Sequence, residues 1–136
     1  MTQQNRICPE SNSALEGLYR SRSMYCTQCE AEGFRKITYF LDRPDVLSSF
    51  TTTVRGERSK CPVLLSNGNL VASGPDEVDG DRHWAKWVDP WPKPCYLFAV
   101  VAGDLEFIED SFTTEPSGKE VTLRIYTEVW SLFSFE

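Results

Sequence analysis

Short runs of apolar and β-branched residues, separated by turn-forming residues, follow one another along most of the 136-residue chain. Runs of this length are typical of strands, whereas an amphipathic helix needs a longer stretch with a period of 3.6 residues. The pattern predicts strands over Phe34–Phe40, Ser49–Val54, Pro62–Ser66, Leu70–Ser73, His83–Val88, Cys95–Ala102, Leu105–Phe112 and Val121–Thr127. The expected fold class is therefore all-β.

Two of these runs carry a clearer local pattern. Asn67-Gly68 lies between two apolar runs, and an Asn-Gly pair in that setting predicts a tight type I′ hairpin. In the last run, Val121, Leu123 and Ile125 alternate with more polar residues, which predicts a strand with one buried face. Both patterns favour strands that lie side by side in a sheet.

Prolines interrupt the pattern at two places. Pro44–Ser49 is the one short helix that the sequence predicts, because proline suits a first helical turn. Asp89–Pro94 holds three prolines, and each proline lacks the N–H that a sheet ladder needs. This stretch is therefore predicted to be a rigid connector outside the sheets.

Charge and cysteine content limit the partners and the compartment. The formal net charge is −6, which repels phosphate backbones and argues against nucleic acid as a partner. The longest apolar run, Tyr96–Ala102, is far too short to span a membrane, and the first twenty residues hold no apolar signal segment. Five cysteines in such a context are expected to be reduced thiols of a cytoplasmic protein.

Histidine and tryptophan offer little catalytic chemistry. His83 is the only histidine, so no site in this sequence can draw on two imidazoles. It lies in an alternating run and is interpreted as a half-exposed cross-strand residue. Trp84, Trp87 and Trp91 could form a platform for a sugar ring, but packing against a β-core is the favoured interpretation.

Cys26 and Cys29 form a C-x-x-C pair, which suits half of a zinc site or a redox pair. A zinc ribbon needs a second close pair, whereas Cys61 and Cys95 stand alone. Buried structural thiols are therefore the favoured interpretation, and a stand-alone zinc or redox protein is the less favoured alternative.

The segment that follows is rich in carboxylates. If it is extended, Gln28, Glu30 and Glu32 point to one side and the small residues between them point to the other. A carboxylate held in this way is a good receptor for a substrate ammonium group, and Gln28 can both donate to and accept from a peptide backbone. A simple solvated surface is the alternative that composition alone favours.

Several long motifs resemble the N-terminal domain of the bacterial and plant-type aminopeptidase N family of zinc metallopeptidases. They are NSALEGLY at 12–19, CTQCEAEGFRKIT at 26–38, LDRPD at 41–45, LLSNGN at 64–69, DPWPKPCYLFAVVAG at 89–103 and SFTT at 111–114. The resemblance implies a partial saddle-like β-sandwich of antiparallel strands. It covers residues 12–127 and leaves 1–11 as an atypical lead-in and 128–136 as an unrelated tail.

The resemblance also implies a site. By position, Gln28 and Glu30 are expected to bind the substrate, with the glutamate on the free α-amino group of a peptide. Glu32, Tyr39 and the turn at 42–44 are expected to be structural. The family's zinc ligands and general base lie in a catalytic domain whose motifs this sequence lacks, so no catalytic or metal-ligating residue and no cofactor is assigned to it.

The expected function is therefore that of a domain fragment of an enzyme that removes N-terminal amino acids from peptides. It contributes amine recognition, is inactive alone, and has a peptide N-terminus and a catalytic domain or chain as its partners. A non-catalytic binding module is the alternative function.

Overall fold

The computed structural model describes residues 2–128 and divides after Gly103 into two compact units. The described part of the chain is built of strands and short 3₁₀ turns, which confirms the all-β prediction. The first unit contains η1 (Pro9–Ser11), β1 (Gly17–Ser21), β2 (Met24–Gln28), η2 (Phe34–Lys36), β3 (Leu47–Glu57), β4 (Val63–Ser66), β5 (Asn69–Pro75), β6 (Arg82–Pro94), η3 (Cys95–Leu97) and β7 (Val100–Gly103). The second contains β8 (Glu106–Thr113) and β9 (Glu120–Thr127).

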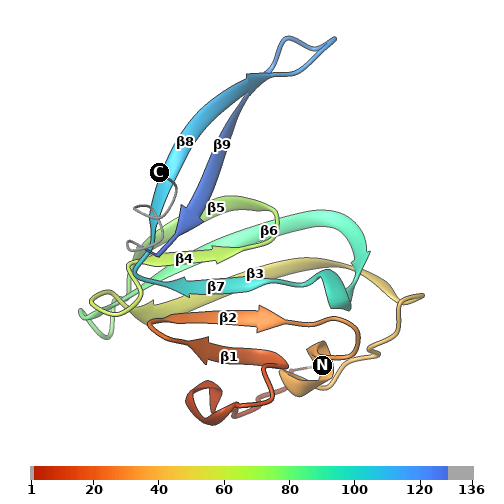
Figure 1. Ribbon diagram of the computed structural model, residues 1–136, viewed down its shortest axis with the longest axis vertical. Helices are drawn as coiled ribbons and strands as arrows, with labels where there is room; N and C mark the ends of the chain where they lie inside the picture. Colours follow the sequence, from red (N-terminus) through yellow and green to blue (C-terminus); the bar gives the residue numbers. More distant parts are fainter. Residues whose placement is uncertain (1, 129–136) are drawn as a thin grey trace, which may run out of the picture. The chain divides into compact units, whose positions relative to one another are not determined.

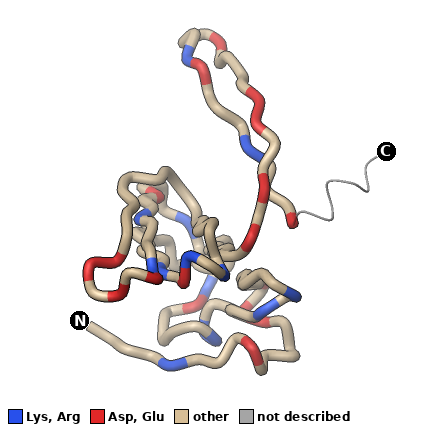
Figure 2. The backbone as a smooth tube through the Cα atoms, turned by 90° about the vertical axis from the view of Figure 1, so that its left-hand side faces the viewer, with Lys and Arg blue, Asp and Glu red and all other residues tan. Residues whose placement is uncertain are grey.

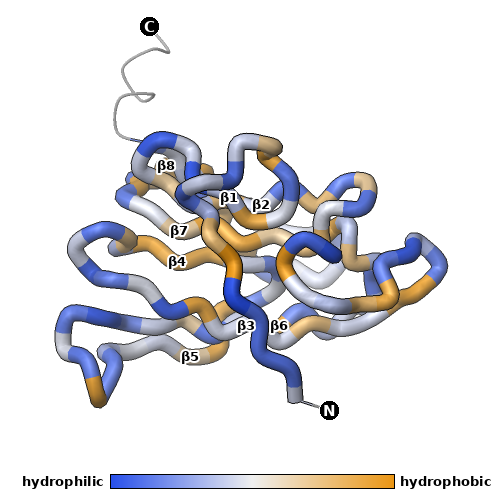
Figure 3. Tube along the Cα trace, turned by 90° about the horizontal axis from the view of Figure 1, so that it is seen from below, coloured by the Kyte–Doolittle hydropathy of each residue, from blue (hydrophilic) through white to orange (hydrophobic). Residues whose placement is uncertain are grey.

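The first unit is a two-layered antiparallel sandwich. One sheet has the strand order β1-β2-β7-β4 and the other the order β3-β6-β5 (Figure 1). Viewed from below, the strands of the first sheet lie above those of the second (Figure 3). Leu64 and Ala102 from one sheet pack with Ala85 from the other and with Cys61, so the main core lies between the layers.

A second, aromatic cluster lies beside the turn that follows β2. Its buried members are Phe34, Cys29 and Cys95. The ring of Phe34 makes edge contacts with Phe50 and Phe98, at centroid distances of 6.0 Å and 5.1 Å. Phe34 thereby fixes the start of η2 against strand β3 and against the segment after η3.

Strands β8 and β9 form a hairpin. Ile108 is the register partner of Ile125, and the residues of β9 alternate between two faces as predicted. The predicted burial of the apolar face is not observed, because Ile108 is 59% and Ile125 68% exposed. Acidic residues outnumber basic ones along the hairpin (Figure 2).

Two of the predicted strands are largely wrong, and two strands were not predicted. Phe34–Phe40 forms η2 and a loop, because Phe34 inserts into the aromatic cluster and the backbone N–H of Arg35 donates to a side chain rather than to a sheet. The first part of Cys95–Ala102 is η3, and only its end forms β7. Strands β1 and β2 were not predicted because polar residues in this stretch interrupt the alternation of apolar and polar positions.

The Asn67-Gly68 turn exists, but it is not a hairpin turn. Strand β4 before it pairs with β7, and β5 after it pairs with β6, so the turn is a corner between the two sheets. The Asn67 amide holds this corner by donating to the Leu97 carbonyl at 3.1 Å and accepting from the Ala99 N–H at 2.6 Å. Gly68 has φ +85°, and a Cβ there would lie 2.2 Å from the Val88 carbonyl oxygen.

The two proline-based predictions are also wrong. Pro44 begins a turn that leads directly into β3 instead of a helix. Asp89–Pro94 continues β6 and pairs with β3 across an irregular register. Prolines two residues apart in a strand leave the same edge of that strand without N–H donors. The pairing of β5 with β6 ends at Val88, before the first of these prolines. The prolines are therefore tolerated where β6 has lost its second neighbour.

Candidate functional site

The predicted site residues lie where strand β2 ends and turns back. Gln28 is the last residue of β2 and pairs with Gly17 of β1. The chain then forms a turn at 30–33 that is closed by a hydrogen bond from the Gly33 N–H to the Cys29 carbonyl at 2.9 Å. The extended arrangement considered for this segment is therefore wrong beyond Gln28.

Gly33 makes this tight return possible. A Cβ at this position would lie 2.3 Å from the Gln28 carbonyl oxygen and 2.9 Å from the Cys29 Cα. Both are backbone atoms that no rotamer change can move. The turn that presents Glu30 thus packs directly on the end of β2.

Glu30 differs from the acidic residues around it in having no partner. Its side chain is exposed and makes no hydrogen bond or ion pair with any residue that the structure describes. The neighbouring carboxylates are all paired: Glu32 with Arg35 at 3.2 Å, Asp42 with Arg35 at 3.1 Å, and Asp45 with Arg43. Glu30 is the carboxylate of this turn that is free to bind a cation.

Asp42 is the buried acid beneath the turn, with its side chain only 3% exposed. One carboxylate oxygen accepts hydrogen bonds from the backbone N–H and the Nε of Arg35, at 3.0 Å and 3.1 Å. The other accepts one from the Cys95 thiol at 3.0 Å. Burial alone would raise the pKa of Asp42, but the hydrogen bonds from Cys95 and Arg35 outweigh it and hold this pKa below its ordinary value.

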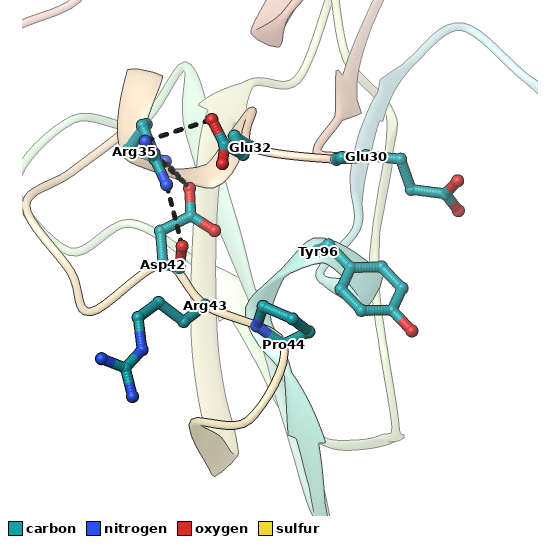
Figure 4. Close-up of a pocket in the computed structure, with 8 residues that line it drawn as sticks. Glu30, Glu32, Arg35, Asp42, Arg43, Pro44 and Tyr96 are labelled. Carbon is teal, nitrogen blue, oxygen red and sulfur yellow. Dashed lines mark hydrogen bonds and ion pairs between the residues drawn. The ribbon is translucent and has the colours of Figure 1, made fainter.

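A pocket of about 370 Å³ opens beside these groups, and Figure 4 shows the residues that line it. Its lining is Glu30, Ala31, Glu32, Arg35, Asp42, Arg43, Pro44 and Tyr96. Arg35 is directed at Glu32 and Asp42 (Figure 4). Glu30 and Tyr96 extend in the other direction, so the carboxylate and the phenol ring occupy the same side of the pocket (Figure 4).

Arg35 was not predicted among the residues that line the pocket, and neither was Tyr96. Tyr96 lies in a run read as a strand, and nothing in its local pattern relates it to Glu30, 66 positions earlier by residue number. The predicted structural roles of Glu32 and of the turn at 42–44 agree with the ion pairs of Glu32 and Asp42. Gln28 does not line this pocket, although it directly precedes the turn.

The surroundings of Cys29 disfavour a metal or redox role for the C-x-x-C pair. Cys29 lies in the aromatic cluster, where burial and the charge of Asp42 raise its pKa to about 11, which disfavours the thiolate that either chemistry requires. Within residues 2–128, no three or more side chains of His, Cys, Asp and Glu are grouped so that they could hold a metal ion. The described residues therefore do not fit the zinc that the resemblance implies.

Packing accounts for His83 and Trp87, whereas the packing interpretation is wrong for Trp91, which is 77% exposed. His83 is half-buried and directs Nε2 to the Cys61 carbonyl at 2.7 Å, in agreement with the cross-strand interpretation. Trp87 packs against the main core and donates to the Leu64 carbonyl at 3.2 Å. No helix in the described part of the chain is long and apolar enough to cross a membrane.

Comparison with known proteins identifies the family. Residues 6–97 match the family model of the peptidase M1 N-terminal domain. The chain belongs to this family. It is 60% identical over 124 residues to aminopeptidase N of Escherichia coli, a match that covers 91% of this chain and 14% of that protein. It is 54% identical over 122 residues to aminopeptidase N of Haemophilus influenzae, covering 90% and 14% of the two chains.

A solved structure supports the same assignment of an M1 N-terminal domain. Aminopeptidase A of Legionella pneumophila, in complex with aspartic acid, superimposes with a TM-score of 0.77 at 38% identity. The match covers 82% of this chain and 13% of that one. The chain thus corresponds to about 14% of the length of the curated relatives it matches.

Proposed function

We propose that this M1 N-terminal domain supplies α-amine recognition to a zinc metalloaminopeptidase that removes N-terminal amino acids from peptides. The observation that carries the proposal is the unpaired carboxylate of Glu30, which lies on a closed turn among carboxylates that all have cationic partners. Glu30 binds the ammonium group at the end of the peptide. Gln28, at the end of β2, binds the adjoining peptide backbone.

The physical basis is the pairing of opposite charges at a fixed position. An ammonium group offers three donors, and its hydrogen bonds to a carboxylate are among the stronger ones in proteins. Because Arg35 and Arg43 are already engaged by other acids, they do not compete for Glu30. A receptor at a fixed place in an enzyme aligns the first peptide bond with the catalytic groups, which gives specificity for the chain end.

One further point supports amine recognition. The matched Legionella pneumophila enzyme was solved with aspartic acid, an amino acid that bears a free α-amine. The described residues of the present chain do not fit a zinc ion, so we derive no catalytic step from them. We propose instead that a catalytic domain or chain is the partner of this domain, and that the 136-residue chain alone does not hydrolyse peptides.

We also propose that the protein works in a reducing, cytoplasmic compartment. All five cysteines are free thiols, and free thiols persist where the glutathione and thioredoxin systems keep them reduced.

The test is a titration of the isotope-labelled 136-residue chain with each of two peptides, in which NMR chemical shifts report binding. The peptides are trialanine amide with a free α-amine and the same peptide with its amine acetylated. We expect the free amine to bind about tenfold more tightly, which corresponds to about 1.4 kcal/mol of charge-assisted hydrogen bonding. The largest shifts are expected at 28–33. Equal affinity for the two peptides would overturn the proposal.

A further inference from the structure

We infer that Asp42 is a positioning residue that holds both ends of the turn on which Glu30 lies. Cys29 directly precedes Glu30, and Glu32 follows it two positions later. Glu32 is connected to Asp42 through Arg35, and Cys29 shares a buried cluster with Cys95, whose thiol donates to Asp42. The geometry of the turn follows from these contacts and does not require a bound ligand. Only the consequence for amine binding rests on the proposed function.

The end of the turn after Glu30 is held through Arg35. The Nη1 of Arg35 pairs with the carboxylate of Glu32 at 3.2 Å. Arg35 in turn makes three hydrogen bonds to Asp42: its backbone N–H and Nε donate to the carboxylate, and its Nη2 donates to the Asp42 carbonyl at 2.9 Å. One guanidinium therefore connects the exposed acid of the turn to the buried acid beneath it.

The end of the turn before Glu30 is held through the aromatic cluster. Cys29 is 2% exposed and belongs to the same buried group as Cys95, which is 1% exposed. The Cys95 thiol donates its hydrogen bond to the second oxygen of Asp42 at 3.0 Å. The carboxylate thus accepts from Arg35 with one oxygen and, with the other, from Cys95, a member of the cluster that contains Cys29.

This arrangement depends on an ionised Asp42, because both oxygens of its carboxylate accept hydrogen bonds. A neutral amide of the same shape presents an N–H₂ group to either Arg35 or Cys95, so at least one donor loses its acceptor. Buried donors left without an acceptor disturb the structure around them. We expect the turn to open more often and the direction of the Glu30 carboxylate to vary, without loss of the sandwich core between the two sheets.

The test compares Asp42→Asn with Asp89→Asn in the full chain. Asp89 is a matched control because it is equally buried, at 6% exposed against 7%, and pairs with Lys93 instead of with the turn. The first readout is hydrogen exchange of the Gly33 amide, which closes the turn on the Cys29 carbonyl. The second is the affinity ratio between the free-amine and acetylated peptides.

We expect Asp42→Asn to speed Gly33 exchange by about tenfold and to lower the affinity ratio toward one, while Asp89→Asn changes neither. An unchanged Gly33 exchange rate in Asp42→Asn overturns the inference. The exchange readout needs no ligand, so a wild-type chain that shows no amine preference contradicts the proposed function and leaves this test intact.

A second pair of variants keeps the inference testable if Asp42→Asn does not fold. Cys95→Ser keeps a donor toward Asp42, and Cys95→Ala removes it. We expect slow Gly33 exchange to be retained in the serine variant and lost in the alanine variant. Equal exchange rates in the two would contradict a positioning role.

Discussion

The thiol of Cys95 donates a hydrogen bond to the carboxylate of Asp42 across 3.0 Å, although the two residues lie 53 positions apart in the chain. The same carboxylate accepts hydrogen bonds from Arg35. Three segments of the first unit therefore meet at one buried charge: η2, the loop before β3, and η3. These contacts hold the turn that carries Glu30 in place.

The ionised form of Asp42 should contribute stability that depends on pH. Its pKa is lower in the folded state, so the contribution is complete above the unfolded pKa, about 3.9 for an aspartate, and disappears as the pH falls through the folded pKa. We expect the difference in unfolding free energy between wild type and Asp42→Asn to be largest near neutral pH and to shrink in acid. Urea unfolding at a series of pH values measures it. A difference that stays constant into acid would contradict the account.

Substitution of Gly33 should disturb the turn through a backbone clash. In Gly33→Ala, the new methyl group meets the Gln28 carbonyl oxygen, and relief of such overpacking costs about 1–3 kcal/mol. Gly80→Ala is the control, since a Cβ at that position has nothing within 4 Å and is expected to change stability by less than about 0.5 kcal/mol. Denaturant unfolding compares the two, and equal stabilities would show that the turn is not closely packed on β2.

The thiols should differ widely in reactivity. Burial raises the pKa of Cys29 to about 11, and burial together with the hydrogen bond to Asp42 raises that of Cys95 to about 12. Cys8 is exposed. We expect iodoacetamide at mildly alkaline pH to modify Cys8 rapidly, and Cys29 and Cys95 only after denaturation, as monitored by mass spectrometry. Labelling of Cys95 in the native protein at the rate of Cys8 would contradict the burial of the cluster.

The apolar face of the β8–β9 hairpin should promote self-association. Ile108 and Ile125 are cross-strand partners that are 59% and 68% exposed. Replacing both with threonine keeps the strand propensity and removes apolar surface. Sedimentation velocity is expected to show concentration-dependent association of the wild-type chain and less association of the double variant. Identical sedimentation of the two proteins would rule out this face as the cause.

The fold class could be predicted from sequence because strand formation here follows local patterns. Most runs of alternating apolar residues became strands, as in β3 and β9. The exceptions depend on partners that a local pattern does not contain. Asn67-Gly68 has the residue types of a hairpin turn, but the strands on either side of it do not pair with each other: β4 pairs with β7, and β5 pairs with β6. The prolines of β6 are acceptable only because β5 ends before them.

The site could be predicted only in part, and for the same reason. Gln28 and Glu30 were singled out by their residue types, their spacing and the family resemblance. The contacts that hold the turn were not visible, because Asp42 and Cys95 are distant in sequence and their hydrogen bond forms only in the folded chain. Nor does a sequence reveal which of several glutamates lacks a partner, since that depends on where Arg35 and Arg43 are directed.

The most direct measurement is the affinity of the free-amine peptide for Glu30→Gln and for Glu16→Gln. Both variants replace one exposed carboxylate near the turn, but Glu16 already pairs with Lys36, whereas Glu30 has no partner among the described residues. We predict that Glu30→Gln loses the preference for the free amine over the acetylated peptide and that Glu16→Gln keeps it. Equal retention of that preference in both variants would contradict amine recognition by Glu30.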